Sequence, residues 1–105
     1  MQTGRDELEF DEINGFITVE CDGRWWLAYV LRQFQESQEI EAKFLSPPGP
    51  AISFKYPQRE DIFTVTYEQV LAKVDPSTTT GRMYTISKEE AEKSSKFLDI
   101  FLSQE

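Results

Sequence analysis

The chain has 105 residues and a formal net charge of −8, with 19 acidic side chains, 11 basic ones and no histidine. Nucleic-acid affinity comes largely from Lys and Arg side chains that displace counterions, so this charge disfavours DNA or RNA as a partner and favours cationic peptides. With no histidine and one cysteine, Cys21, the chain lacks the usual nucleophile–base pairs and zinc ligands, so we expect no enzyme, metal or cofactor.

The first thirteen residues are predicted to form an acidic tail. Residues 1–12 carry five acidic side chains against one arginine, a composition typical of a mobile segment. Leu8, Phe10 and Ile13 leave open a short strand or helical turn that docks on the body of the protein. The sequence contains neither an apolar signal segment nor an apolar run long enough to span a membrane, which predicts an intracellular protein with no membrane partner.

Residues 14–75 carry the pattern of a small β domain. Residues 16–21 are rich in strand formers and end at Asp22-Gly23, a strong hairpin signal, and residues 24–34 continue as a second strand. Further strands are expected at residues 40–45, 52–56, 62–65 and 71–74. Residues 67–70 are expected to form a helical or 3₁₀ turn, and a continuous strand is the alternative there. Residues 46–50 include three prolines, which lack a backbone N–H, so this segment must be a loop or an edge.

The C-terminal part of the chain is predicted to be a polar linker and extended segment over residues 76–86, followed by an amphipathic helix over residues 87–105. Ser87 and Glu90 have the spacing of a capping box, in which each side chain satisfies a backbone N–H of the other residue. Apolar residues recur at three- and four-residue steps from Ala91 to Leu102, so one stripe of the helix is buried. We expect it to pack on the β domain, and a partner protein is the alternative.

Both tryptophans lie in residues 22–30, Asp-Gly-Arg-Trp-Trp-Leu-Ala-Tyr-Val. Neighbouring residues of a strand point to opposite faces, so one indole can fill the core while the other is available to a ligand. This stretch resembles the early strands of the Tudor and related royal-superfamily barrels, in which an acidic-Gly turn leads into Trp-Tyr, one residue, Ala, one residue, Val. It is also similar to the Pro-Trp-Trp-Pro family, although Arg24 and Leu27 stand where that family has its prolines.

The resemblance implies a mainly β fold, a small SH3-like, Tudor-like five-stranded barrel with a C-terminal α-helix. It also implies nuclear residence and the binding of methyl-lysine or methyl-arginine between aromatic rings. The matching positions place Trp26 and Phe44 in such a cage, with Tyr56 as a third wall and Glu20 or Asp22 as the complementary acid. Because Val19 and residues 47–49 replace two further aromatic positions of the family, the cage is partial. Trp26 and Phe44 can equally be core residues.

Two functions therefore remain open. The first is a non-catalytic protein-interaction module, a chromatin-type reader that binds a basic or histone-tail-like peptide, with or without methylation, through the partial cage. The second is a structural adaptor that binds a partner through its C-terminal helix or a sheet edge and recognises no methylated ligand.

Overall fold

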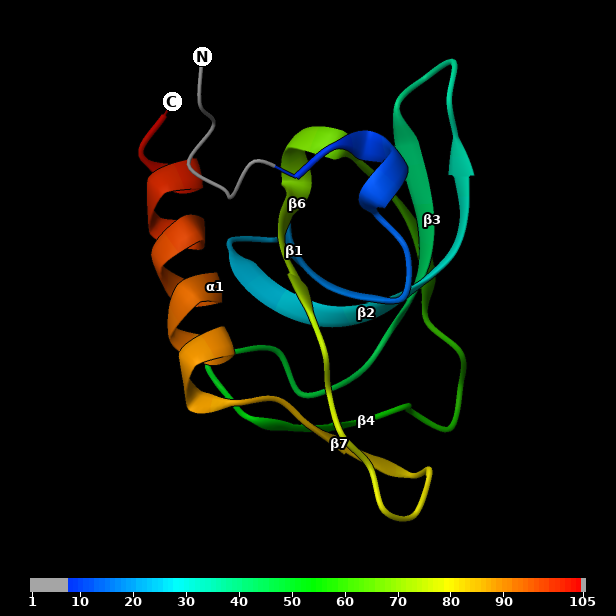
Figure 1. Ribbon diagram of the computed structural model, residues 1–105, viewed down its shortest axis with the longest axis vertical. Helices are drawn as coiled ribbons and strands as arrows, with labels where there is room; N and C mark the ends of the chain where they lie inside the picture. The colour runs from blue at the N-terminus through cyan, green and yellow to red at the C-terminus, as the bar shows by residue number, and fades with distance from the viewer. Residues whose placement is uncertain (1–7, 105) are drawn as a thin grey trace.

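Seven β-strands and one C-terminal α-helix make up residues 8–104, the part of the chain that this computed structural model describes (Figure 1). Two short 3₁₀ turns, η1 and η2, complete the secondary structure. In chain order the elements are η1 (Phe10–Glu12), β1 (Phe16–Cys21), β2 (Arg24–Phe34), β3 (Glu39–Phe44), β4 (Ser53–Lys55), β5 (Ile62–Thr66), η2 (Tyr67–Gln69), β6 (Val70–Val74), β7 (Met83–Thr85) and α1 (Lys88–Leu102).

Five strands form one antiparallel sheet in the order β5-β3-β2-β1-β6. The hairpin from β1 to β2 turns at Asp22 and Gly23, both with positive φ, which matches the twist of the flanking strands. β5 and β6 lie at the two edges and do not pair with each other, so within residues 8–104 the sheet is open and does not close into a barrel. The expectation of a mainly β fold with a C-terminal helix is confirmed.

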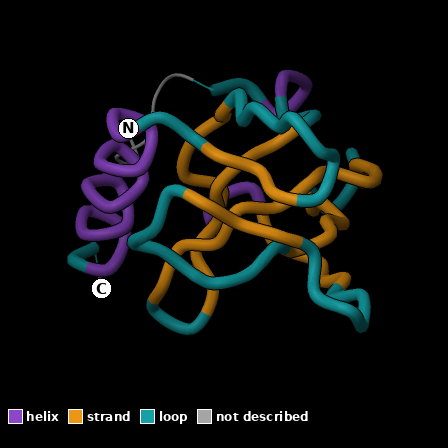
Figure 2. Tube along the Cα trace, turned by 90° about the horizontal axis from the view of Figure 1, so that it is seen from below, coloured by secondary structure: helices purple, strands orange, loops and turns teal. Residues whose placement is uncertain are grey.

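The second sheet consists of β4 and β7, which are far apart in the sequence and lie together at the lower end of the view in Figure 1. Phe54 of β4 is paired with Tyr84 of β7. The segment expected to be a linker followed by extended chain therefore contributes a strand. This small sheet and α1 both flank the five-stranded sheet, and Figure 2 shows the helix standing to one side of the strands.

The N-terminal segment docks on the five-stranded sheet from residue 8 onward. Phe10 and Ile13 are buried, and the side-chain amide of Gln33 donates hydrogen bonds to the backbone oxygens of both residues. The Tyr67 hydroxyl donates to the backbone oxygen of Leu8. Residues 8–13 therefore form the docked turn that the sequence left open as the alternative to a mobile tail. Residues 1–7 of the predicted tail lie outside the described part of the chain.

Two hydrophobic clusters occupy opposite faces of the five-stranded sheet. The first cluster collects buried residues from the N-terminal segment and the sheet, among them Phe10, Ile13, Ile17, Val19, Ala28, Ile40, Ala42, Phe44, Val65 and Val70. The second cluster lies under α1 and β4 and contains Trp25, Leu27, Leu45, Phe54, Leu71, Val74, Ile86 and Ala91. The buried stripe of the helix thus packs on the protein's own β domain, as the sequence predicts.

Small residues allow the helix to approach the sheet closely. Ala91 and Ser94 are the buried residues of α1, and the Ser94 hydroxyl shares a fully buried hydrogen bond of 2.8 Å with the Thr18 hydroxyl of β1. The hydroxyl of the next residue, Ser95, accepts a hydrogen bond of 2.9 Å from the Trp25 indole. The helix is therefore attached to β1 and β2 by polar as well as apolar contacts.

Candidate functional site

An aromatic row, defined here as Trp26, Phe44 and Phe63, runs diagonally across β2, β3 and β5. The ring centroids of Trp26 and Phe44 are 6.0 Å apart, and those of Phe44 and Phe63 are 5.2 Å apart. All three side chains lie on one face of the sheet, because cross-strand partners share a face and so do residues two apart on one strand. Ala28, two residues after Trp26, is opposite Phe44, and Ala42, two residues before Phe44, is opposite Phe63.

Exposure differs sharply along the aromatic row. Phe44 is only 3% exposed and belongs to the first hydrophobic cluster, whereas Phe63 is 51% exposed and Trp26 is partly exposed. The Trp26 indole is held in place because its Nε1 donates a hydrogen bond of 3.2 Å to the backbone oxygen of Cys21. Phe44 therefore supports the row from below, while Trp26 and Phe63 present ring surface to solvent.

Sequence reasoning found Trp26 and Phe44 but missed Phe63. The alternation of residues 62–65 indicated a strand without indicating which strand it would join, and only that pairing brings Phe63 beside Phe44.

Tyr56 lies in a different aromatic group. Its ring is 5.7 Å from that of Tyr84, and the Lys43 ammonium lies 4.8 Å from the Tyr56 ring centroid. Lys43 also forms an ion pair of 3.1 Å with Glu60. Since Lys43 and Phe44 are successive residues of β3, their side chains leave the strand on opposite faces, so the structure does not bring Tyr56 to the aromatic row.

Burial raises the pKa of Tyr56 to about 12, with smaller contributions from the neighbouring phenols of Tyr84 and Tyr29. The phenol is therefore neutral at physiological pH, and one of its ring faces is already occupied by a cation of the same chain. This arrangement stabilises the fold locally and leaves less of the Tyr56 ring for an external ligand.

The two acidic candidates lie at the β1–β2 hairpin. The Glu20 carboxylate accepts hydrogen bonds from the Gly23 backbone N–H (3.0 Å) and from the Gln69 side chain (3.3 Å). In the β1–β2 register Glu20 is opposite Trp25, so it shares its face with that indole and not with Trp26. Asp22 is exposed in the turn itself. Of the five predicted site residues, the structure thus joins only Trp26 and Phe44 by a direct ring contact.

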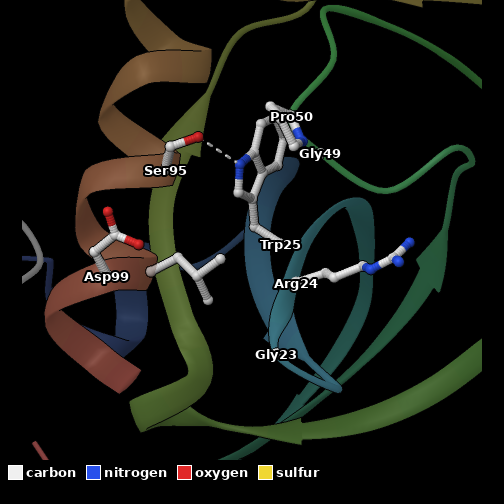
Figure 3. Close-up of a pocket in the computed structure, with 8 residues that line it drawn as sticks. Gly23, Arg24, Trp25, Gly49, Pro50, Ser95 and Asp99 are labelled. Atoms are coloured by element: carbon white, nitrogen blue, oxygen red, sulfur yellow. Dashed lines mark hydrogen bonds between the residues drawn. The ribbon is translucent and has the colours of Figure 1, made fainter. Parts of the chain in front are cut away.

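A separate cleft of about 490 Å³ lies between the hairpin, the proline-rich loop and α1 (Figure 3). Arg24 and Asp99 stand on opposite sides of Trp25 there, and Gly49 and Pro50 lie against the indole. Trp25 is only 1% exposed, so its ring offers almost no surface to a ligand. The residues that line the cleft include no cysteine or lysine, and the hydroxyl of Ser95 accepts the hydrogen bond from the Trp25 indole.

The chemistry of the remaining polar groups is limited. Burial raises the pKa of Cys21, and the adjacent Asp22 and Glu20 add to this effect, so the thiol stays protonated near neutral pH. Among residues 8–104, no three Cys, Asp or Glu side chains are grouped so that they could hold a metal ion.

The described part of the chain contains no helix that is both long and apolar enough to cross a membrane.

Comparison with known proteins identifies no family or relative for this chain. No protein-family model matches the chain, and no curated protein or solved structure shows significant similarity to it.

Proposed function

We propose that the protein is a non-catalytic interaction module that binds a basic segment of another protein at the aromatic row. The observation that carries this proposal is the exposure of Phe63 and Trp26 on either side of the buried Phe44. A cation over an aromatic face is stabilised by about 0.5–1 kcal/mol when exposed and by about 2 kcal/mol when desolvated. The net charge of −8 raises the local concentration of cationic peptides and speeds their encounter.

The proposal includes a fold and a ligand class. We regard the five-stranded sheet as an open variant of the Tudor-like, SH3-like barrel, supported by the β1-β2-β3 meander and the Trp-Trp motif at the start of β2. The ligand class is a histone-tail-like peptide bearing lysine or arginine, methylated or not, which would act in the nucleus. Methylation spreads the cation's charge over a larger, less hydrated group, which suits aromatic surfaces.

The aromatic row replaces the cage that the sequence predicts. Trp26 and Phe44 are retained, Phe63 stands in for Tyr56, and Asp22 is the acid with an exposed carboxylate near the start of β2. An open row of this kind contacts a cation on fewer sides than a closed cage does. We therefore expect modest affinity and weak discrimination between methylation states.

An NMR titration tests the proposal. The labelled protein is mixed with lysine peptides that are unmodified or carry one, two or three methyl groups, and with dimethyl-arginine peptides. We expect shifts at the Trp26 indole and at the Phe63 amide, and we expect Phe63→Ala to weaken binding by roughly fivefold to thirtyfold, corresponding to a loss of about 1–2 kcal/mol.

Met83→Ala is the matched control, because Met83 is 47% exposed, similar to Phe63, but lies on β7 away from the aromatic row. It should bind like the parent protein. Equal weakening by both substitutions, or shifts that avoid the aromatic row, would refute the proposed site.

A further inference from the structure

β5 is an edge strand with an unprotected outer side. It pairs with β3 on one side, and within the described part of the chain no other strand pairs with it on the other. Proteins commonly protect such edges with lysine, proline or a bulge, yet all five residues of β5 are uncharged and none is proline. The edge can therefore accept a further strand.

The hydrogen bonding of β5 shows which backbone groups point outward. The Phe44 N–H donates to the backbone oxygen of Asp61 at 2.8 Å, so Asp61 turns its carbonyl group toward β3. Because hydrogen-bonded positions alternate along an antiparallel pair, Phe63 also faces β3 with its backbone. Ile62 and Thr64 consequently direct their N–H and C=O groups to the free side of the strand.

The outward edge ends at Thr66. Its N–H donates to the Gln69 side chain at 2.9 Å, as part of the cap of η2, and is thus already used. The following residue, Tyr67, donates its N–H to the backbone oxygen of Gln38 at 3.0 Å, which fits the same alternation. The C=O of an N-cap residue likewise accepts the first bond of its turn, so the free side offers the donors and acceptors of two residues, Ile62 and Thr64.

The side chains of β5 supply apolar contacts on both faces of such a strand. Phe63 is 51% exposed on the face of the aromatic row, and Ile62 is 41% exposed on the other face. An extended segment beside β5 would place alternate side chains next to each of them. The edge and the aromatic row are thus parts of one continuous surface.

The charges around β5 favour a basic occupant. The carboxylates that flank the strand are Glu39 and Glu41 on β3, Glu60 and Asp61 before the strand, and Glu68 after it. Arg32 pairs with Glu41 at 3.0 Å, and Lys43 pairs with Glu60 at 3.1 Å. Arg59 is a third basic residue near the strand, so the five carboxylates outnumber the three basic groups around β5. A second copy of this chain is disfavoured because each copy carries a net charge of −8.

We propose that a basic peptide in extended conformation binds by adding a strand to the free side of β5, which rests on the proposed function and gives it a binding mode. The backbone of the peptide exchanges hydrogen bonds with Ile62 and Thr64. Its side chains alternate between an apolar or cationic group over Phe63 and basic groups toward the flanking carboxylates. Main-chain pairing provides affinity, and the alternate side chains provide specificity.

The test uses a fluorescein-labelled peptide of alternating Lys and Val, acetylated and amidated at its ends, with binding measured by fluorescence anisotropy. Thr64→Pro removes the outward N–H and blocks the edge, and proline is tolerated on an edge strand where the N–H faces solvent. Thr64→Ala is the matched control that keeps the N–H. We expect the proline variant to bind at least tenfold more weakly and the alanine variant within about twofold of the parent, in line with a lost hydrogen bond plus a steric block.

A second measurement does not depend on how the proline variant folds. Two versions of the peptide are N-methylated, one at every lysine and the other at every valine, so that opposite sets of backbone N–H groups are removed. Because only alternate residues of an added strand bond to its neighbour, we expect one version to lose binding and the other to keep it.

The outcomes separate the binding mode from the proposed function. Equal binding by both N-methylated peptides, or parent-like binding by Thr64→Pro, overturns strand addition. If Phe63→Ala still weakens binding in that case, the aromatic row stands without the added strand. Failure of the parent protein to bind this peptide and the methylated peptides overturns both.

Discussion

Among the glycines of residues 8–104, Gly49 is the one at which adding a methyl group should disturb the packing most. A Cβ atom there would lie 2.1 Å from Cε2 and 2.3 Å from Cζ2 of Trp25, far inside van der Waals contact. The indole has little room to withdraw, because it is 1% exposed and bonded to Ser95. The loop also cannot lift freely, since the Gly49 N–H donates to the Trp25 backbone oxygen at 2.7 Å.

These contacts give the expected size of the effect for Gly49→Ala. Overpacking a filled site costs about 1–3 kcal/mol, and displacing the indole from Ser95 adds the loss of a hydrogen bond of about 1 kcal/mol. The reduced freedom of the unfolded chain returns about 0.4–1 kcal/mol. We therefore expect the free energy of unfolding to fall by about 2 kcal/mol, or the Tm by roughly 8–16 °C for a domain of this size.

Urea and thermal unfolding, followed by circular dichroism and tryptophan fluorescence, measure this effect. The control is Gly81→Ala, where a Cβ meets no atom within 4 Å but φ is +75°, so only backbone strain of about 1–2 kcal/mol is expected. Gly49→Ala should change the near-ultraviolet signal of Trp25, and Gly81→Ala should not. A Gly49→Ala protein as stable as its parent, with unaltered tryptophan spectra, would show that the loop does not hold the indole.

Three further predictions concern the helix contacts and Tyr56. Ser94→Ala should lower the free energy of unfolding by about 1–3 kcal/mol, because it leaves the buried Thr18 hydroxyl unsatisfied, and adding Thr18→Val should recover part of this loss in urea unfolding. Folding raises the pKa of Tyr56 from 10.0 to about 12, so the contribution of the neutral phenol to stability is complete below pH 10 and is lost as the pH rises from 10 to 12. Over this pH range the urea midpoint should fall more in the parent protein than in Tyr56→Phe. Deleting residues 87–105 should uncover the second hydrophobic cluster and give an aggregated or unfolded chain by size-exclusion chromatography and circular dichroism, whereas a soluble, folded product would contradict the packing described for α1.

Elements whose cause is local could be predicted from the sequence. Asp22-Gly23 determined the first hairpin, since both residues adopt the positive φ that such a turn requires. Ser87 and Glu90 determined the start of α1, where both side-chain contacts of the capping box are present. Each signal depends on residues only a few positions apart, so no knowledge of the rest of the chain is needed.

The composition of the candidate site was decided by tertiary structure. Alternation shows that Trp25 and Trp26 face opposite ways, but the arrival of α1 and the proline-rich loop on one face decides that Trp25 is the buried one. Likewise, the pairing of β5 with β3 brings Phe63 to Phe44, and Lys43 holds Tyr56 on the other face. Strand order and burial depend on contacts between residues that are far apart in the sequence, so a local sequence pattern does not predict them.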